Sequence, residues 1–178
     1  MPARIEIATA RLLLVGADAA LLNAELAGRE VLGSELGVTV PSHWPPKHMD
    51  EPAIRWMLAL VERLPTDAPW RMYYILLPGT PSLVIGTCGY KGLPDTDGAV
   101  EIGYSVLNDH WRCGYASEAA SALVASAWRH GAQQAIAETY PALTASRRVM
   151  EKCGMVLVGQ GSEAGVIRYA VEKSGRHE

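Results

Sequence analysis

The sequence contains no phenylalanine, so its core has to be built from aliphatic side chains, methionine, seven tyrosines and five tryptophans. Its three cysteines, Cys88, Cys113 and Cys153, are odd in number and share no C-x-x-C spacing. This pattern argues against a disulfide framework and against a zinc knuckle. No apolar run approaches the ~18 residues that a membrane-spanning helix needs, and the N-terminus has no signal-peptide pattern. We therefore expect a cytoplasmic protein with reduced thiols.

An excess of positive charge is also missing. The 16 lysines and arginines are outnumbered by 19 acidic residues, which gives a net charge of -3. A general nucleic-acid binder needs a broad basic surface to neutralise phosphates, so this class is disfavoured. The five histidines are scattered without metal-ligand spacing, and we expect no metal site. A small local anion site remains compatible with this charge.

Common nucleotide-binding and hydrolase signatures are absent as well. The sequence has no G-K-[ST] phosphate loop and no G-x-S-x-G elbow. The glycine-rich stretch at residues 86–92 does not have the G-x-G-x-x-G spacing, and it leads into Pro94 instead of a helix. A dinucleotide-binding fold is therefore disfavoured, and glycines that bend a strand are the simpler interpretation.

The 178 residues show no repeat, low-complexity tract or linker, and this length suits one domain over residues 1–178. Helical spacing predicts helices at residues 18–31, 50–64, 114–130 and 144–154, with Asp18, Asp50 and Thr144 as N-caps. Residues 33–47 are expected to form a loop. Strands are predicted at residues 6–15, 71–77, 83–90, 99–107, 135–139, 155–158 and 166–171. The order predicts an α+β fold with a mixed, mostly antiparallel sheet of about seven strands and about four helices.

The most informative segment, W-R-C-G-Y-A-S-E-A at residues 111–119, joins a predicted strand to a predicted helix. A glycine-centred turn that opens a helix directs several unpaired backbone N–H groups into one concavity, where the helix dipole adds positive charge. Such a site can hold a pyrophosphate without net basic charge, and Arg112 adds one cation. The alternative is that Gly114 only permits a tight turn.

This segment resembles the acetyl-CoA loop of the GNAT superfamily of N-acetyltransferases, [Q/R]-x-x-G-x-[G/A], with Trp111, Gly114 and Ala116 at its first, fourth and sixth positions. Trp followed by G-Y-A-[S/T]-E-A is similar to the ribosomal-protein-alanine N-acetyltransferase branch. Residues 144–155, T-A-S-R-R-V-M-E-K-C-G-M, resemble a second block of that branch. Residues 101–104 match its E-I-G-Y strand. The three blocks occur in the right order.

The resemblance implies a GNAT fold whose sheet is splayed in the middle, with acetyl-CoA as co-substrate in a cleft between the strands at 99–107 and 135–139. The pantetheine would pair with backbone groups around Val106 and Leu107. The pyrophosphate would bind the N–H groups of Arg112, Cys113, Gly114, Tyr115, Ala116 and Ser117.

The implied reaction is direct attack of an amine on the thioester, so the amine must lose a proton and the departing thiolate must be stabilised. Glu101 is the candidate base, acting directly or through water. A carboxylate in a partly apolar cleft is expected to have a raised pKa, which makes it better able to take a proton. The alternative is a solvated or ion-paired strand carboxylate. Ser146 is the candidate that stabilises the thiolate, or it only caps the backbone. A family tyrosine is replaced by Met150, and a family asparagine by Leu143.

The acceptor site is expected beside the segment between the first two helices, with His43 and Trp44 as wall residues and Tyr104 as a further contact. Trp44 could instead pack its loop onto the core. The branch implies a protein or peptide N-terminus as acceptor, and a small-molecule amine remains open. Leu143 and Met150 leave a third hypothesis, a non-catalytic acyl-CoA-binding relative. We expect a monomer or a homodimer.

Overall fold

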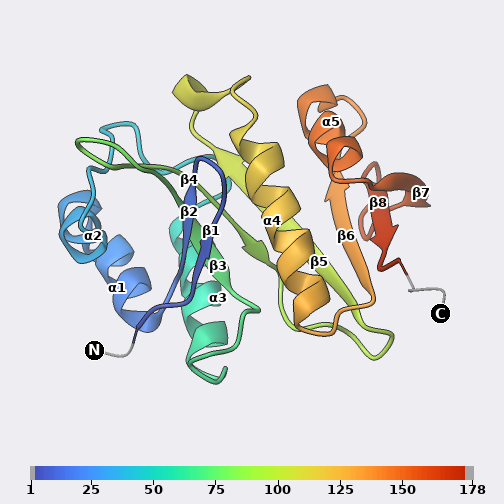
Figure 1. Cartoon of the computed structure of the whole chain (residues 1–178), viewed down its shortest axis with the longest axis horizontal. Helices are drawn as coiled ribbons and strands as arrows, with labels where there is room; N and C mark the ends of the chain where they lie inside the picture. Colours follow the sequence, from blue (N-terminus) through green and yellow to red (C-terminus); the bar gives the residue numbers. More distant parts are fainter. Residues whose placement is uncertain (1–2, 175–178) are drawn as a thin grey trace.

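The computed structural model describes residues 3–174, which form an eight-stranded sheet in the order β1-β2-β3-β4-β5-β6-β8-β7 (Figure 1). Neighbouring strands are antiparallel except β5 and β6, which are parallel. The prediction of a mixed, mostly antiparallel sheet is therefore confirmed, with one strand more than expected. The strands are β1 Glu6–Ala8, β2 Leu13–Gly16, β3 Met72–Leu77, β4 Leu83–Tyr90, β5 Ala99–Val106, β6 Gln134–Thr139, β7 Val156–Gln160 and β8 Ile167–Glu172.

The additional strand arises because the predicted strand at residues 6–15 is in fact a hairpin of β1 and β2. The chain reverses where the N–H of Thr9 donates to the carbonyl of Leu12 at 2.9 Å. The Thr9 hydroxyl oxygen in turn accepts the N–H of Leu12 at 3.0 Å. This side-chain bond stabilises a tight reversal without glycine or proline, and it places Arg11 at the tip of the hairpin.

The described residues contain five α-helices, one more than predicted, because the expected helix at residues 18–31 is broken at Gly28. Gly28 has a φ of 131°, which no helix accommodates, and the chain restarts as a second helix. The expected loop at residues 33–47 therefore begins only after Leu36. The helices are α1 Ala19–Ala27, α2 Arg29–Leu36, α3 Glu51–Val61, α4 Tyr115–Arg129 and α5 Thr144–Lys152, with a short 3₁₀ turn, η1, at Asn108–His110.

Two hydrophobic cores lie on opposite faces of the sheet. One core lies between the sheet and the helices α4 and α5, with Leu123 and Met150 among its buried side chains. The other lies beneath α1, α2 and α3, with Leu22, Leu32 and Ile54. Figure 1 shows α4 lying along the sheet beside α5, with α1 and α2 at the other end of the molecule. A single sheet thus serves both cores.

The sheet divides between β5 and β6. These strands pair only over Ala99–Gln134, Val100–Ala135 and Glu101–Ile136, whereas β5 stays paired with β4 as far as Val106. Figure 1 shows β5 and β6 side by side at one end and apart at the other. The expected splay is therefore present. We call the place where the strands part, after Glu101 and Ile136, the fork.

Candidate active site

Beyond the fork, one edge of β5 carries backbone groups that face away from β4. The N–H of Lys91 donates to the carbonyl of Glu101 at 2.9 Å, and the N–H of Leu107 donates to that of Ile85 at 2.8 Å. Because backbone groups alternate in direction along an antiparallel strand, Tyr104 and Val106 present theirs toward the β6 side. This is the type of edge to which an amide-containing ligand can add as a strand.

The two residues predicted to pair with pantetheine differ in this respect. Leu107 already uses its N–H with Ile85, and its carbonyl accepts the N–H of His110 at 2.9 Å. Val106 faces the fork, although the indole N–H of Trp111 donates to its carbonyl at 2.7 Å. The structure therefore favours Val106 over Leu107 as a ligand-pairing residue.

The turn at residues 112–117 presents a series of free backbone N–H groups. None of the N–H groups of these residues donates a hydrogen bond within residues 3–174. Arg112 and Gly114 have φ angles of 61° and 81°, and left-handed residues of this kind turn successive N–H groups toward one side. Helix α4 begins at Tyr115, so its dipole contributes to the same place. The predicted pyrophosphate role of these residues remains a prediction, and this geometry is what it requires.

Arg11 is a residue of this region that the sequence did not reveal. Its Nη1 donates to the carbonyl of Cys113 at 2.9 Å, and its Nε donates to Oε2 of Glu118 at 2.7 Å. The guanidinium carbon lies 4.6 Å from the ring centroid of Tyr115. Burial tends to raise the pKa of Glu118, but hydrogen bonds from Thr9 and Arg11 lower it overall. The partners are more than a hundred positions from Arg11 in sequence, so no local pattern points to them.

The candidate base, Glu101, lies at the fork as the last β5 residue paired with β6. Its Oε1 lies 2.5 Å from Nζ of Lys91, and its side chain is 24% exposed. This geometry matches the ion-paired alternative in the free protein. A role of Glu101 as base remains a prediction.

On the opposite face of β5, Tyr104 meets Ser146 of α5. The phenol of Tyr104 donates to the carbonyl of Ser146 at 3.0 Å, and its oxygen lies 3.2 Å from Oγ of the same serine. Burial raises the pKa of Tyr104 to about 12, although the hydrogen bond with Ser146 opposes this shift. The phenol therefore stays protonated near neutral pH. The structure brings these two hydroxyls together although 42 positions separate them.

The start of α5 corrects one expectation. Thr144 was predicted to cap this helix, but it is the first helical residue, and the N-cap position is Leu143, which makes no side-chain cap. Met150, at the family's tyrosine position, is 2% exposed and packs in the core, and its thioether has no proton to donate. Tyr104 and Ser146 form a hydroxyl pair on this side of the fork.

The two residues predicted to line the acceptor site, His43 and Trp44, make contacts in different parts of the structure. The Trp44 indole N–H donates to Oε1 of Glu25 at 2.6 Å, and the Tyr74 phenol donates to Oε2 at 2.8 Å. Trp44 thus packs its loop onto the core, and it also lines a recess of about 230 Å³. His43 instead lies next to Asp109, which belongs to the turn η1 that precedes residues 112–117. The distance from His43 Nε2 to Asp109 Oδ2 is 3.3 Å. Their roles toward an acceptor remain predictions.

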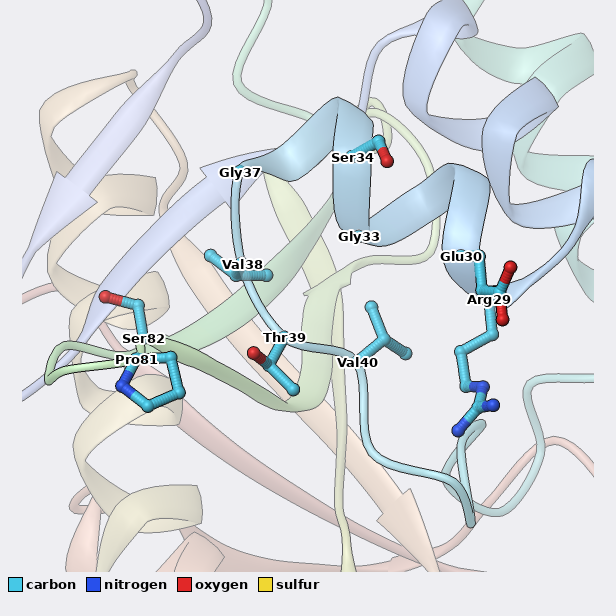
Figure 2. Close-up of a pocket in the computed structure, with 10 residues that line it drawn as sticks. All are labelled: Arg29, Glu30, Gly33, Ser34, Gly37, Val38, Thr39, Val40, Pro81 and Ser82. Carbon is cyan, nitrogen blue, oxygen red and sulfur yellow. The ribbon is translucent and has the colours of Figure 1, made fainter.

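A larger depression, of about 630 Å³, lies elsewhere, between α2, the segment after it and the β3–β4 turn (Figure 2). Figure 2 shows Thr39 close to Ser82, and the N–H of Thr39 donates to the Ser82 carbonyl at 2.9 Å. None of the predicted site residues lines this depression. We place the candidate site at the fork instead, because the free backbone donors are there.

Two further features concern only residues 3–174. No group of three or more His, Cys, Asp or Glu side chains in this part is arranged to hold a metal ion. No helix in the same part is long and apolar enough to cross a membrane. All three cysteines are free thiols: Cys88 is buried, Cys153 is half-buried and Cys113 is exposed.

Comparison with known proteins agrees with this arrangement. A family model described as an acetyltransferase (GNAT) domain matches residues 11–156, which include the fork, α4 and α5. The chain belongs to the GNAT acetyltransferase family. The match includes the strand with Glu101, the turn at residues 112–117 and Ser146.

Individual relatives are distant. Over 163 residues the GNAT chain is 29% identical to YjdG, an uncharacterised N-acetyltransferase of Bacillus subtilis, covering 87% of this chain and 92% of that protein. It is 34% identical over 70 residues to the uncharacterised N-acetyltransferase p20 of Bacillus licheniformis, and the match spans 39% of that protein.

Solved structures share the fold. The ribosomal-protein-S5-alanine acetyltransferase of Vibrio fischeri has a TM-score of 0.69 at 16% identity, covering 94% of this chain and 96% of that one. The ribosomal L7/L12 α-N-protein acetyltransferase RimL, in complex with coenzyme A, has a TM-score of 0.66 at 19% identity, covering 94% and 98%.

Proposed function

We propose that this GNAT protein transfers an acetyl group from acetyl-CoA to a primary amine, and that its acceptor is a protein or peptide N-terminus. The observation that carries the proposal is the set of free N–H groups at residues 112–117, next to the unpaired edge of β5. A pyrophosphate and an amide-containing arm on one ligand match these two features together. The residues present therefore fit acetyl-CoA. The sheet shared by both cores supports a single domain.

Each part of the chain then has a binding task. The N–H groups of residues 112–117 would hold the pyrophosphate, and α4 would add the positive end of its dipole. The backbone of Tyr104 and Val106 would pair with the pantetheine arm. Because the Trp111 indole N–H donates to the Val106 carbonyl, the N–H of Val106 is the more accessible partner.

The two proton-handling groups lie on opposite faces of β5. Acetyl-CoA supplies the acetyl group as a thioester, and the residues of this chain manage the protons. Glu101 and Tyr104 are three positions apart, and side chains at an odd spacing on a strand point to opposite faces. The amine proton would be removed on the α1–α3 face. The departing sulfur would face Ser146 and Tyr104, on the α4–α5 face.

Glu101 would act through water. Three residues of a strand span about 10 Å, which is more than a glutamate side chain covers. A carboxylate at the fork therefore reaches an amine on its own face, level with Tyr104 along the strand, only by way of an ordered water. In the free protein this carboxylate is ion-paired with Lys91, so the ordered water would have to approach the oxygen atom that Lys91 does not contact.

Two alternatives are open to the same test. A small-molecule amine could be the acceptor, and Leu143 and Met150 are compatible with a relative that binds acyl-CoA without transfer. The structural neighbours that act on ribosomal proteins favour the protein acceptor.

The test combines calorimetry with acetyl-CoA and a thiol-release assay. The acceptors are peptides with a free N-terminal alanine or serine, the same peptides N-acetylated, and a set of polyamines and aminoglycosides. We expect release with the free peptides and none with the blocked ones. Thiol release only with the small amines would show that the acceptor is a small amine and not a peptide. Binding of acetyl-CoA without release on any acceptor would favour the non-catalytic alternative. No heat on adding acetyl-CoA would refute the whole proposal.

A further inference from the structure

We infer that Arg11 is a positioning residue for the turn at residues 112–117: it fixes the Cys113–Gly114 peptide so that the N–H of Gly114 faces the ligand. The inference rests on the proposed acetyl-CoA function and assigns a role to a residue of the β1–β2 hairpin. Arg11 reaches the turn from the tip of that hairpin, across from the first turn of α4.

The evidence is a set of three simultaneous contacts. Arg11 donates from Nη1 to the Cys113 carbonyl at 2.9 Å and from Nε to Glu118 at 2.7 Å, and it lies over the ring of Tyr115. Its own backbone N–H also donates to Oε1 of Glu118 at 2.7 Å. Arg11 is thus held through both its backbone N–H and its guanidinium.

The contact between Arg11 and the Cys113 carbonyl also fixes the direction of the Gly114 N–H, because both groups belong to one planar peptide. In a trans peptide the carbonyl of one residue and the N–H of the next point in opposite directions. Since the Cys113 carbonyl points to Arg11, the N–H of Gly114 points away from it. Arg11 therefore lies behind the turn and the free N–H lies in front.

The turn needs an external support of this kind. Parallel N–H dipoles repel one another, and the N–H groups of residues 112–117 have no acceptor in the part of the chain that the structure describes. Arg112 also has a left-handed φ of 61°, which costs a non-glycine residue free energy. A carbonyl held by a charged donor opposes rotation of the peptide out of this arrangement.

Glu118 completes the arrangement. Its two oxygens accept from the Thr9 hydroxyl, the Arg11 N–H and the Arg11 Nε, so the carboxylate aims the guanidinium. An unpaired carboxylate in the first turn of α4 would repel a phosphate placed there. Arg11 thus has two separable effects, orientation of the peptide and neutralisation of Glu118.

The variants Arg11→Lys, Arg11→Gln and Arg11→Gln with Glu118→Gln separate these effects. Lysine keeps the positive charge but has no planar fork to bond Glu118 and Cys113 together. Arg4→Gln is the matched control, because Arg4 also bonds two carboxylates and a backbone carbonyl, at Asp18 and Glu35. Those contacts are on the α1 and α2 side.

The experiment measures the dissociation constant of acetyl-CoA by calorimetry, the KM and kcat of thiol release, and the melting temperature of each variant. We expect both Arg11 single variants and the double variant to bind acetyl-CoA at least about tenfold more weakly, the effect of one lost charged hydrogen bond. We expect the effect in KM, with kcat largely retained. Arg4→Gln should lose thermal stability but keep its affinity.

Three results would overturn the inference while wild-type binding and transfer keep the proposed function intact. Wild-type affinity in Arg11→Lys would mean that charge alone matters. Restored affinity in the double variant would mean that Arg11 only neutralises Glu118. Unchanged affinity in Arg11→Gln would remove any role. If Arg11→Gln melts below the assay temperature, Arg11→Lys, which keeps a cation beside Glu118, decides the question.

Discussion

Replacing Tyr104 by phenylalanine removes one oxygen atom from the α4–α5 side of the fork and leaves the half-buried ring in place. The lost phenol donates to the Ser146 carbonyl at 3.0 Å and lies 3.2 Å from the Ser146 hydroxyl. A neutral hydrogen bond contributes about 1 kcal/mol, so we expect the melting temperature to fall by a few degrees. Ser146 would also lose the partner that fixes the direction of its hydroxyl.

The kinetic effect should be larger than the loss of stability suggests. Positioned proton donors contribute about 10²- to 10⁴-fold to a rate, so a Ser146 hydroxyl free to rotate should lower kcat by roughly tenfold to a hundredfold. The affinity for acetyl-CoA should stay near that of the wild type, because the free N–H groups of residues 112–117 are untouched. The assay is thiol release under saturating acetyl-CoA, with calorimetry on the same preparation.

The control is Tyr90→Phe. Tyr90 is buried in the same core, and its phenol donates to the Leu123 carbonyl of α4 at 2.7 Å. Its loss should lower stability by a similar amount without changing kcat. Combining Tyr104→Phe with Ser146→Ala gives the decisive comparison, because a residue that acts through Ser146 has no further kinetic effect once that hydroxyl is gone. Equal losses of kcat with and without the Ser146 hydroxyl would refute the reasoning.

Three further changes test other parts of the site. Gly114→Ala adds a Cβ 3.3 Å from Nη2 of Arg11 at a φ of 81°, so we expect a loss of about 1 kcal/mol in unfolding free energy and weaker acetyl-CoA binding by calorimetry. Glu101→Gln should lower kcat with acetyl-CoA affinity retained, and an unchanged pH–rate profile would contradict a base role. Glu118 has a lowered pKa, so its stabilising contribution is present above the unfolded-state pKa and is lost as the pH falls. The difference in unfolding free energy between the wild type and Glu118→Gln, measured from pH 7 to pH 3, should therefore shrink with acidification.

The sequence predicted best where local pattern decides the structure. Strand β4 has the predicted bounds, and α4 begins one residue after Gly114, because proline- and glycine-rich turns bound the strand and a glycine opens the helix. The turn at residues 112–117 was predicted on the same local grounds. The free N–H groups of residues 114–117 follow from helix geometry, since the first turn of a helix lacks internal acceptors, whereas those of Arg112 and Cys113 precede the helix.

Prediction failed where one residue redirects the chain. Gly28 separates α1 from α2 through a φ of 131°, although the apolar pattern around it is continuous enough to suggest one helix. Thr9 reverses the β1–β2 hairpin through its side chain, without the glycine or proline that usually indicates a turn. In both cases the pattern of hydrophobic residues indicated which side chains are buried, but not where the helix or the strand is interrupted.

The contacts that complete the site depend on register and on distant segments. Lys91 faces Glu101 because the β4–β5 turn sets these two residues opposite each other, and a shift by one position would move the lysine to the other face. Arg11 reaches Cys113, and Tyr104 reaches Ser146, across separations of 102 and 42 positions. Such pairs follow from the packing of whole elements, which one sequence does not determine.

The spacing of Glu101 and Tyr104 constrains how an acceptor would approach. Because the two side chains lie on opposite faces of one strand, the proposed roles would place proton removal on one face of that strand and the departing sulfur on the other. On the Glu101 face, the loop before α3 is held at two points, by Trp44 at Glu25 and by His43 at Asp109. An acceptor that approaches Glu101 would therefore have to pass this anchored loop. The loop would limit the size and shape of the acceptor before its amine reaches the fork.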